Sequence, residues 1–145
     1  KTLPFKDKEF DFVIASHVLE HVEDVNFFIN ELQRISSRGY IELPTILEDN
    51  LVFENKKDHL WHMEFDDVKN ELQISKKIQY LEPVITVSTI KKFSKYFRQS
   101  LILELYWENS IEYIMIVKNS EEYYKFSRLT LVRKFFSKLI RNIIR

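Results

Sequence analysis

The hydrophobic pattern of residues 10–45 predicts a strand, a helix and a second strand. Residues 10–15 are apolar except for Asp11, as expected of a strand covered on both faces. From Asn26 to Ile35 the apolar residues recur at helical spacing. Gly39 then stands where a left-handed residue ends a helix, and residues 40–43 begin the next strand. Elements of this length predict a right-handed crossover between parallel strands.

In sheets of parallel strands, ligands bind beyond the carboxyl ends of the strands. Those ends are followed here by residues 16–21, which include Ser16, His17, Glu20 and His21, and by residues 44–46. These two segments are therefore where we expect the chemistry of this protein.

Four short motifs in this region follow the order typical of one enzyme family. They are Leu3-Pro4-Phe5, Phe10-Asp11, the apolar residues 12–15 and Val18-Leu19-Glu20-His21. Asp24, the helix after it and residues 39–44 continue the pattern. Together they resemble the carboxyl-terminal part of a class I S-adenosylmethionine-dependent methyltransferase of the type 11-like group. The resemblance implies an α/β fold with a Rossmann-like sheet, and S-adenosyl-L-methionine as the cofactor.

The resemblance also implies a glycine-rich cofactor loop that precedes Leu3. Gly39 is the only glycine of the chain, so this loop does not stand elsewhere in the sequence. We therefore expect an incomplete sheet, without the amino-terminal cofactor-binding half, and no activity from this chain by itself. The strand at residues 10–15 is expected to leave an apolar edge unpaired, which favours a marginally soluble or dimeric chain.

The middle of the chain is less regular. Residues 46–57 show no clean period and are predicted to form a loop with room for one turn of helix. Residues 58–65 and 71–75 are predicted to form a β-hairpin, an insertion at about 58–76 that acts as a lid or as a wall of the acceptor site.

A helix and two strands are predicted after the hairpin. The helix begins with a cap at Ser88 or Thr89 and runs to about Phe97. Residues 101–107 and 111–117 then predict an antiparallel pair that closes the sheet, with the second strand central because it is almost wholly apolar.

Charge separates the tail from the rest of the chain. Residues 121–145 hold seven of the 22 basic and two of the 22 acidic residues, so the tail carries a net charge of +5 and the rest −5. We expect a methyltransferase portion at 1–119 and a basic amphipathic helix at 120–145, with one apolar stripe: Leu129, Val132, Phe136, Leu139, Ile140 and Ile143.

A helix of this kind can lie on an anionic membrane surface, bind a protein partner, or pack on its own domain or a dimer mate. Nucleic acid is a poorer candidate, because phosphate contacts do not require a strongly apolar face. The sequence has no cysteine, no apolar run near the roughly 18 residues of a membrane span and no opening secretory signal. We therefore expect a cytoplasmic protein, with peripheral attachment to the inner face of the membrane as one role of the tail.

His17 is the candidate catalytic residue. Methyl transfer to a hydroxyl or an amine needs a base for the acceptor proton, and an imidazole titrates near neutrality. The alternative is that His17 only shapes the wall of the pocket. The resemblance implies cofactor contacts from Leu3, Pro4, Ala15, Ser16 and His17.

Candidate acceptor contacts follow the strand ends and the hairpin. They are His21, Pro44, Thr45, His59 and Trp61. Purely structural roles for some of these residues are the alternatives. Glu20 and His21 begin the next turn and can simply satisfy backbone groups, and His59 and Trp61 can simply pack the hairpin.

The histidine spacings do not predict a metal site. His17 and His21 are four residues apart, but Val18 stands where the zincin pattern requires glutamate. His59 and His62 are three apart, and in a strand such residues point to opposite faces.

Two function classes remain. The first is the acceptor half of an S-adenosylmethionine-dependent methyltransferase, acting on a small molecule, a sugar or a lipid-linked acceptor. The second is a non-catalytic interaction module that uses the basic tail to dock on a membrane or a protein.

Overall fold

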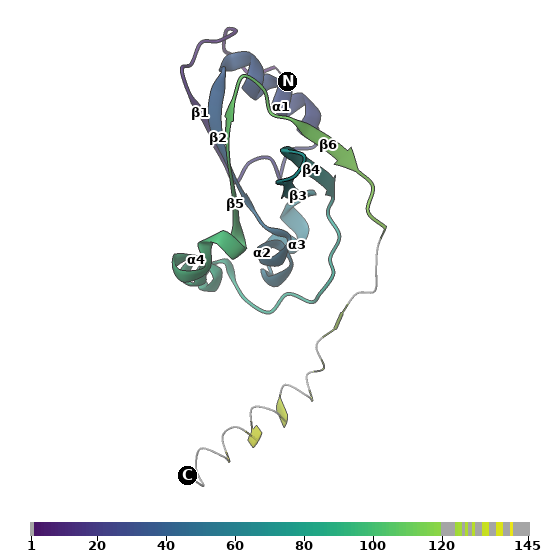
Figure 1. Cartoon of the computed structure of the whole chain (residues 1–145). Coiled ribbons are helices and arrows are strands. Elements are labelled where there is room, and N and C mark those ends of the chain that lie inside the picture. Colours follow the sequence, from purple (N-terminus) through teal and green to yellow (C-terminus); the bar gives the residue numbers. More distant parts are fainter. Residues whose placement is uncertain are drawn as a thin grey trace.

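The computed structural model describes residues 2–119 and, in the tail, residues 124, 125, 127, 129, 132, 133, 136, 137 and 140. It shows a mixed α/β protein with two three-stranded sheets (Figure 1). The strand order is β1-β2-β5 in the first sheet and β3-β4-β6 in the second. The α/β class is confirmed, but the described strands form two small sheets rather than one Rossmann-like sheet.

The predicted crossover is present. β1 (Val13–Ser16) and β2 (Arg38–Pro44) are parallel and are joined by α1 (Val25–Ile35). Asp24 caps α1, because its carboxylate accepts a hydrogen bond of 2.9 Å from the backbone N–H of Phe27. The helix buries one apolar stripe, and each of these side chains contributes about 1.5–3 kcal/mol: Val25, Ile29, Leu32 and Ile35.

Gly39 does not end α1 as predicted. The helix ends at Ser36 in an extended conformation, and Gly39 lies within β2 without a positive φ. Glycine is needed there for space, since an added Cβ would lie 2.5 Å from the carbonyl oxygen of Val13 and 2.8 Å from Nε1 of Trp107. The crowding comes from neighbouring strands, so the local sequence pattern could not show it.

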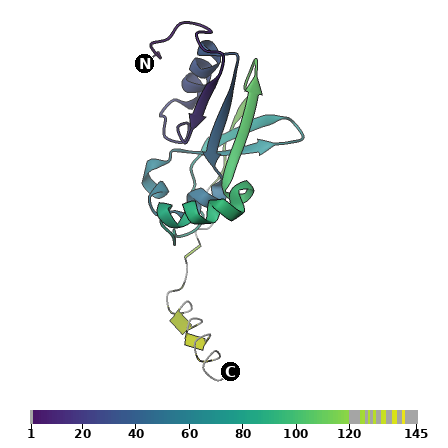
Figure 2. The ribbon, with the colours of Figure 1, turned by 90° about the vertical axis from the view of Figure 1, so that its left-hand side faces the viewer.

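The first sheet is covered on one face only. Ala15 and Ile41 are buried in the core, whereas Phe12 is 45% and Ile14 70% exposed. β1 lies at the edge of this sheet and pairs with β2 (Figure 2). The prediction of a strand covered on both faces is therefore wrong for the described part of the chain.

Two short helices replace the loop predicted at residues 46–57. They are α2 (Ile46–Leu51) and α3 (Asn55–Asp58). Thr45 caps α2, because its hydroxyl oxygen accepts a hydrogen bond of 3.3 Å from the Glu48 N–H. The buried residues of α2 are polar, which hides the helix from a hydrophobic pattern: Glu48, Asp49 and Asn50.

The predicted hairpin is confirmed. β3 (Trp61–Asp66) and β4 (Glu71–Lys76) are antiparallel, with Asn70 in the left-handed conformation of a turn. β3 begins at Trp61 rather than at Asp58, because His59 still caps α3.

The two last strands are not paired with each other. β5 (Ile102–Glu108) is antiparallel to β2, whereas β6 (Tyr113–Ile116) is parallel to β4 at the edge of the second sheet. The chain turns at Asn109, where φ is positive, and Ile111 enters the core. β6 is therefore carried to the hairpin, and the prediction of a central strand beside β5 is wrong.

A helix leads directly into β5. α4 (Val87–Leu101) begins at Thr86, near the predicted cap, and runs four residues past the predicted end. Phe97 has non-helical angles of φ −124° and ψ 31°, so the helix kinks just before Arg98.

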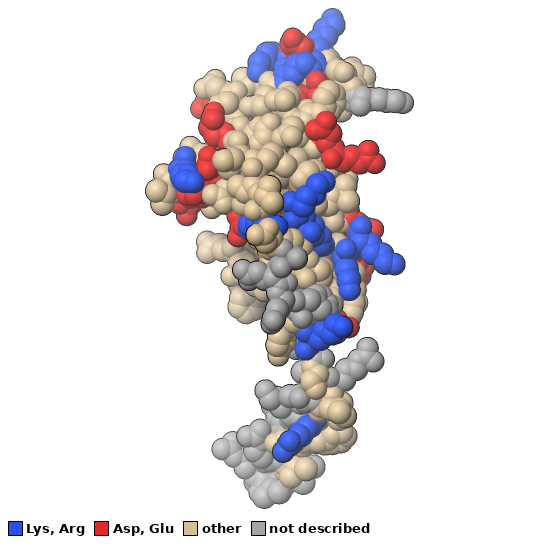
Figure 3. Space-filling model, turned by 90° about the vertical axis from the view of Figure 1, so that its right-hand side faces the viewer, with Lys and Arg blue, Asp and Glu red and all other residues tan. Residues whose placement is uncertain are grey.

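The core lies between α1 and the two sheets, and it contains both tryptophans, Trp61 and Trp107. Basic and acidic side chains share the face shown in Figure 3. Most of the predicted tail helix lies outside the described residues, although four residues of its stripe are described and exposed: Leu129, Val132, Phe136 and Ile140. In the described part of the chain, no helix is long and apolar enough to cross a membrane.

Candidate functional site

A cavity of about 420 Å³ opens at the carboxyl ends of β1 and β2. This is the edge at which the sequence predicted the chemistry. The ionisable residues of its lining come from the end of β1, from β2, α2 and α4, and from the residue that caps α3: His17, Glu42, Glu48, His59, Lys91 and Arg98. Cationic and anionic groups are therefore brought together around one small space.

His17 stands at the end of β1 in a left-handed conformation with φ 52°. Its N–H donates a hydrogen bond of 2.9 Å to the carbonyl oxygen of Glu42, which continues the pairing of β1 with β2. A non-glycine residue in this conformation is uncommon and often belongs to a functional site. The backbone thus turns the imidazole towards the cavity, where it is part of the lining.

Two carboxylates flank the His17 ring. Nδ1 lies 3.2 Å from Oε1 of Glu20, and Nε2 lies 3.5 Å from Oε1 of Glu42. The contact with Glu20 raises the pKa of His17 above its ordinary value, although partial burial of the ring opposes this. His17 therefore keeps its proton to a higher pH than a free histidine.

Glu42 is held in its charged form. Its carboxylate receives hydrogen bonds from Ser16 Oγ at 3.1 Å and Tyr40 OH at 2.8 Å, and pairs with Arg98. Burial opposes ionisation, but these donors outweigh it and hold the pKa of Glu42 below its ordinary value. Glu42 thus gives the cavity a fixed negative charge beside His17.

Glu48 behaves in the opposite way. Burial raises the pKa of Glu48 to about 7, and its Oε2 atom is buried without a hydrogen-bond partner among the described residues. A carboxyl group with such a pKa can accept or release a proton near neutrality. The sequence analysis missed Glu48 because it predicted a loop where α2 holds this residue.

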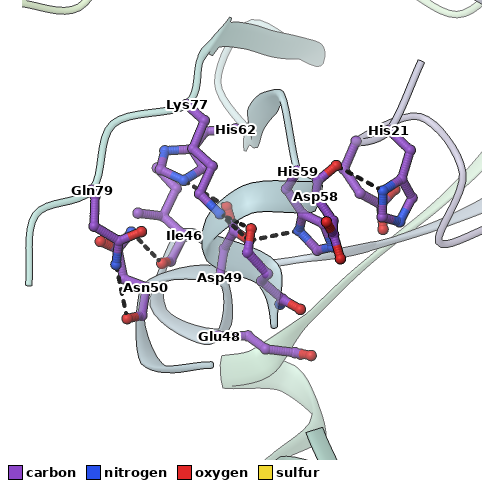
Figure 4. Close-up of polar contacts among 12 residues, drawn as sticks. His21, Ile46, Glu48, Asp49, Asn50, Asp58, His59, His62, Lys77 and Gln79 are labelled. Atoms are coloured by element: carbon purple, nitrogen blue, oxygen red, sulfur yellow. Dashed lines mark hydrogen bonds and ion pairs between the residues drawn. The ribbon is translucent and has the colours of Figure 1, made fainter. Parts of the chain in front are cut away.

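A second polar cluster surrounds Asp49 of α2 (Figure 4). The buried carboxylate of Asp49 lies 2.6 Å from Nδ1 of His59, 2.7 Å from Nε2 of His62 and 3.0 Å from Nζ of Lys77. Burial disfavours the charged form, but the two imidazoles and the Lys77 charge hold the pKa of Asp49 well below its ordinary value.

His59 and His62 therefore converge, contrary to the prediction that they point apart. The prediction placed both residues in one strand. In the structure only His62 lies in β3, while His59 caps α3, so the alternation rule does not relate their directions.

Only some of the predicted site residues meet at the cavity. His17 and His59 line it, and Ser16 bonds to Glu42 beside it. Leu3 and Pro4 do not line the cavity. The N–H of Leu3 donates a hydrogen bond of 2.7 Å to the Glu31 carboxylate in α1.

The other predicted residues have structural contacts. Ala15 and Pro44 are buried, and the Thr45 hydroxyl donates to the carbonyl oxygen of Ser100 at 2.9 Å. Trp61 is a core residue whose Nε1–H donates to the carbonyl oxygen of Val22 at 2.7 Å. His21 is exposed, and its ring meets that of His59 edge to face at 4.6 Å.

The residues expected to contact S-adenosylmethionine are only partly accessible to a ligand. Ser16 and His17 are exposed at the carboxyl edge of the sheet, and Phe12 and Ile14 leave apolar surface beside β1. Gly39, the only glycine, is buried inside β2. The described chain therefore offers no glycine-rich loop whose backbone could approach the cofactor.

One known protein family matches the amino-terminal part of the sequence. Residues 1–41 match the family model of the methyltransferase domain. The resemblance predicted from the sequence is confirmed for this segment, which runs through β1 and α1 into β2. The amino-terminal part of the chain is therefore similar to part of a methyltransferase domain.

A longer part of the chain is similar to an archaeal protein. An uncharacterized protein of Methanocaldococcus jannaschii is 31% identical over 128 residues, which cover 71% of this chain and 56% of that protein. The present chain thus spans about half the length of the relative that it matches.

Proposed function

We propose that this methyltransferase-related chain forms the acceptor side of an S-adenosylmethionine-dependent methyltransferase. The observation that carries the proposal is the position of the cavity. It opens directly after the strand of the family-matched segment and places His17 beside ionisable groups of β2, α2 and α4. The acceptor is a small molecule, a sugar or a lipid-linked molecule with a hydroxyl or amine group.

In this proposal S-adenosylmethionine supplies the methyl group when it is bound. The cavity holds the acceptor, and Glu42 and Arg98 offer its polar groups hydrogen-bond partners. His17 accepts the acceptor proton at Nε2, since Nδ1 faces Glu20. The resulting imidazolium is stabilised by the two neighbouring carboxylates.

The pH dependence of this step has a defined direction. A base must be unprotonated to act, and the Glu20 contact raises the pKa of His17. Methyl transfer should therefore increase as the pH rises through the raised pKa of His17.

The test has two stages. S-adenosylmethionine is first titrated by calorimetry into this chain and into the full product of its gene, where we expect binding by the full product. Production of S-adenosylhomocysteine is then followed with hydroxyl and amine acceptors. His17→Asn should lower kcat by about 10²–10⁴-fold, the usual contribution of a general base.

Lys8→Asn is the matched control, because Lys8 is exposed, has the same φ of 52° and lies outside the cavity. Asparagine tolerates this conformation at both positions. Absence of S-adenosylmethionine binding by both proteins would overturn the proposal. Full activity of His17→Asn would remove His17 as the base.

A further inference from the structure

The strongest unexplained feature is the side chain of Glu20. It is 1% exposed, and neither carboxylate oxygen has a hydrogen bond among the described residues. The His17 ring lies beside it, but the contact is not aligned as a hydrogen bond. His17 is thus the one ion-pair contact of Glu20 in the described part of the chain, and Oε2 has none. A buried carboxylate with so few partners is costly, and native proteins almost always give it a further cation or donors.

Two histidines lie next to this carboxylate. One ligand atom from each of Glu20, His21 and His59 can be chosen so that all three lie within 4.8 Å of one another. The backbone holds them there, since the N–H of Leu60 donates a hydrogen bond of 2.7 Å to the carbonyl oxygen of Glu20. The segment that carries His59 is thereby joined to the loop that carries the other two.

Both histidines are also oriented for metal binding. Nδ1 of His21 lies 2.9 Å from the carbonyl oxygen of Asp58, and Nδ1 of His59 lies 2.6 Å from Oδ1 of Asp49 (Figure 4). A carbonyl oxygen only accepts, so Nδ1 of His21 donates in this contact and its Nε2 keeps the lone pair. Nδ1 of His59 faces the Asp49 carboxylate, which leaves its Nε2 for a ligand. A second nitrogen bonded to a carbonyl or a carboxylate is the usual support of a metal-binding histidine.

We propose that Glu20, His21 and His59 bind one divalent transition-metal ion of the Zn²⁺ type. Two imidazoles and one carboxylate form a ligand set that leaves further coordination positions open. Ligand atoms about 2 Å from an ion lie closer together than 4.8 Å, so binding draws the three inward, and the exposed His21 ring can move.

The position of the ion suggests its use. His59 lines the cavity beside His17, so an open coordination position there meets a ligand in the cavity. If the methyl acceptor binds there, the ion would hold its oxygen atom and lower the pKa of that group. This role rests on the proposed function, whereas metal binding itself does not.

The test is metal binding by the full chain without an affinity tag. After treatment with a chelator, Zn²⁺ is titrated by calorimetry, and Co²⁺ is added as an ion whose visible absorption reports nitrogen and oxygen ligands. We expect one ion per chain. Glu20→Gln and His21→Ala should each weaken binding by more than about tenfold, since each removes a direct ligand.

Glu23→Gln is the matched control, because Glu23 is exposed, lies in the same loop and is not among the three ligands. It should bind Zn²⁺ as the unchanged chain does. Folding of every variant is checked by circular dichroism, and Zn²⁺ should raise the melting temperature of the unchanged chain but not of Glu20→Gln. Absence of a stoichiometric ion, or unchanged binding by both ligand variants, would overturn the site whether or not methyl transfer occurs.

Discussion

Asp49 and Glu20 are two equally buried carboxylates with opposite surroundings. Each is 1% exposed. Asp49 has three cationic or imidazole neighbours within 3.0 Å, which are His59, His62 and Lys77. Glu20 has one among the described residues, the His17 ring at 3.2 Å from Oε1. The difference teaches that burial alone does not reveal what a charged residue does. Removing a carboxylate that balances several buried charges leaves those charges unpaired, whereas removing one with a single partner leaves little unpaired.

The largest expected loss of stability comes from replacing Asp49. Asp49→Ala leaves two histidines and a lysine buried without their anion, so the free energy of unfolding should fall by about 3–5 kcal/mol. Urea unfolding measures this change. Asp67→Ala, at an exposed position of the hairpin turn, should leave the stability almost unchanged. Equal behaviour of the two variants would show that the Asp49 cluster is not structural.

Glu48 should make the free energy of unfolding depend on pH. Its pKa rises from 4.5 to about 7 on folding, so the folded state binds the proton more tightly than the unfolded state. The free energy of unfolding should therefore fall by about 2–3 kcal/mol as the pH rises from 4.5 to 7. The raised pKa of His17 acts in the same direction, since the stability from its proton is lost as the pH rises through that pKa.

Urea unfolding of Glu48→Gln at pH 4.5 and pH 7 measures the Glu48 contribution. The variant should match the unchanged chain at the lower pH and exceed it at the higher pH. Glu23→Gln, at an exposed position, should keep the original pH dependence. A pH dependence that is the same in both variants would contradict this role of Glu48.

The smallest expected effect has the opposite sign to that of Asp49→Ala. Without metal, Glu20→Gln removes a buried charge that has no hydrogen bond, so the free energy of unfolding should stay within about 1 kcal/mol or rise. The measurement is urea unfolding in the presence of a chelator. A loss of unfolding free energy as large as that of Asp49→Ala would show that Glu20 contributes to stability as Asp49 does, which would contradict the proposed difference between them.

Local elements were predictable because their signals are local. The periodic apolar residues of α1, the polar turn of the hairpin and the cap near Thr86 act through neighbours in the sequence. His17 was predictable because it follows the first strand directly. These signals depend on residues only a few positions apart.

Features that depend on distant residues were not predictable. The sequence pattern did not reveal α2, because its buried side is polar. Asp49 on that side pairs with His62 of β3 and with Lys77 after β4. Gly39 looked like the end of a helix because its crowding comes from Val13 and Trp107. β6 was predicted to be central because its sequence is almost wholly apolar. An apolar run does not indicate which strand it pairs with.

The sequence by itself determined the methyltransferase relationship of residues 1–41, the crossover from β1 to β2 and the candidacy of His17. Only the tertiary structure decided that Glu20 and His21 meet His59, and that Asp49 gains three charged partners while Glu20 has only His17 among the described residues. The physical reason is that the energy of a charge depends on everything within a few ångströms of it. The fold brings those neighbours from distant parts of the chain.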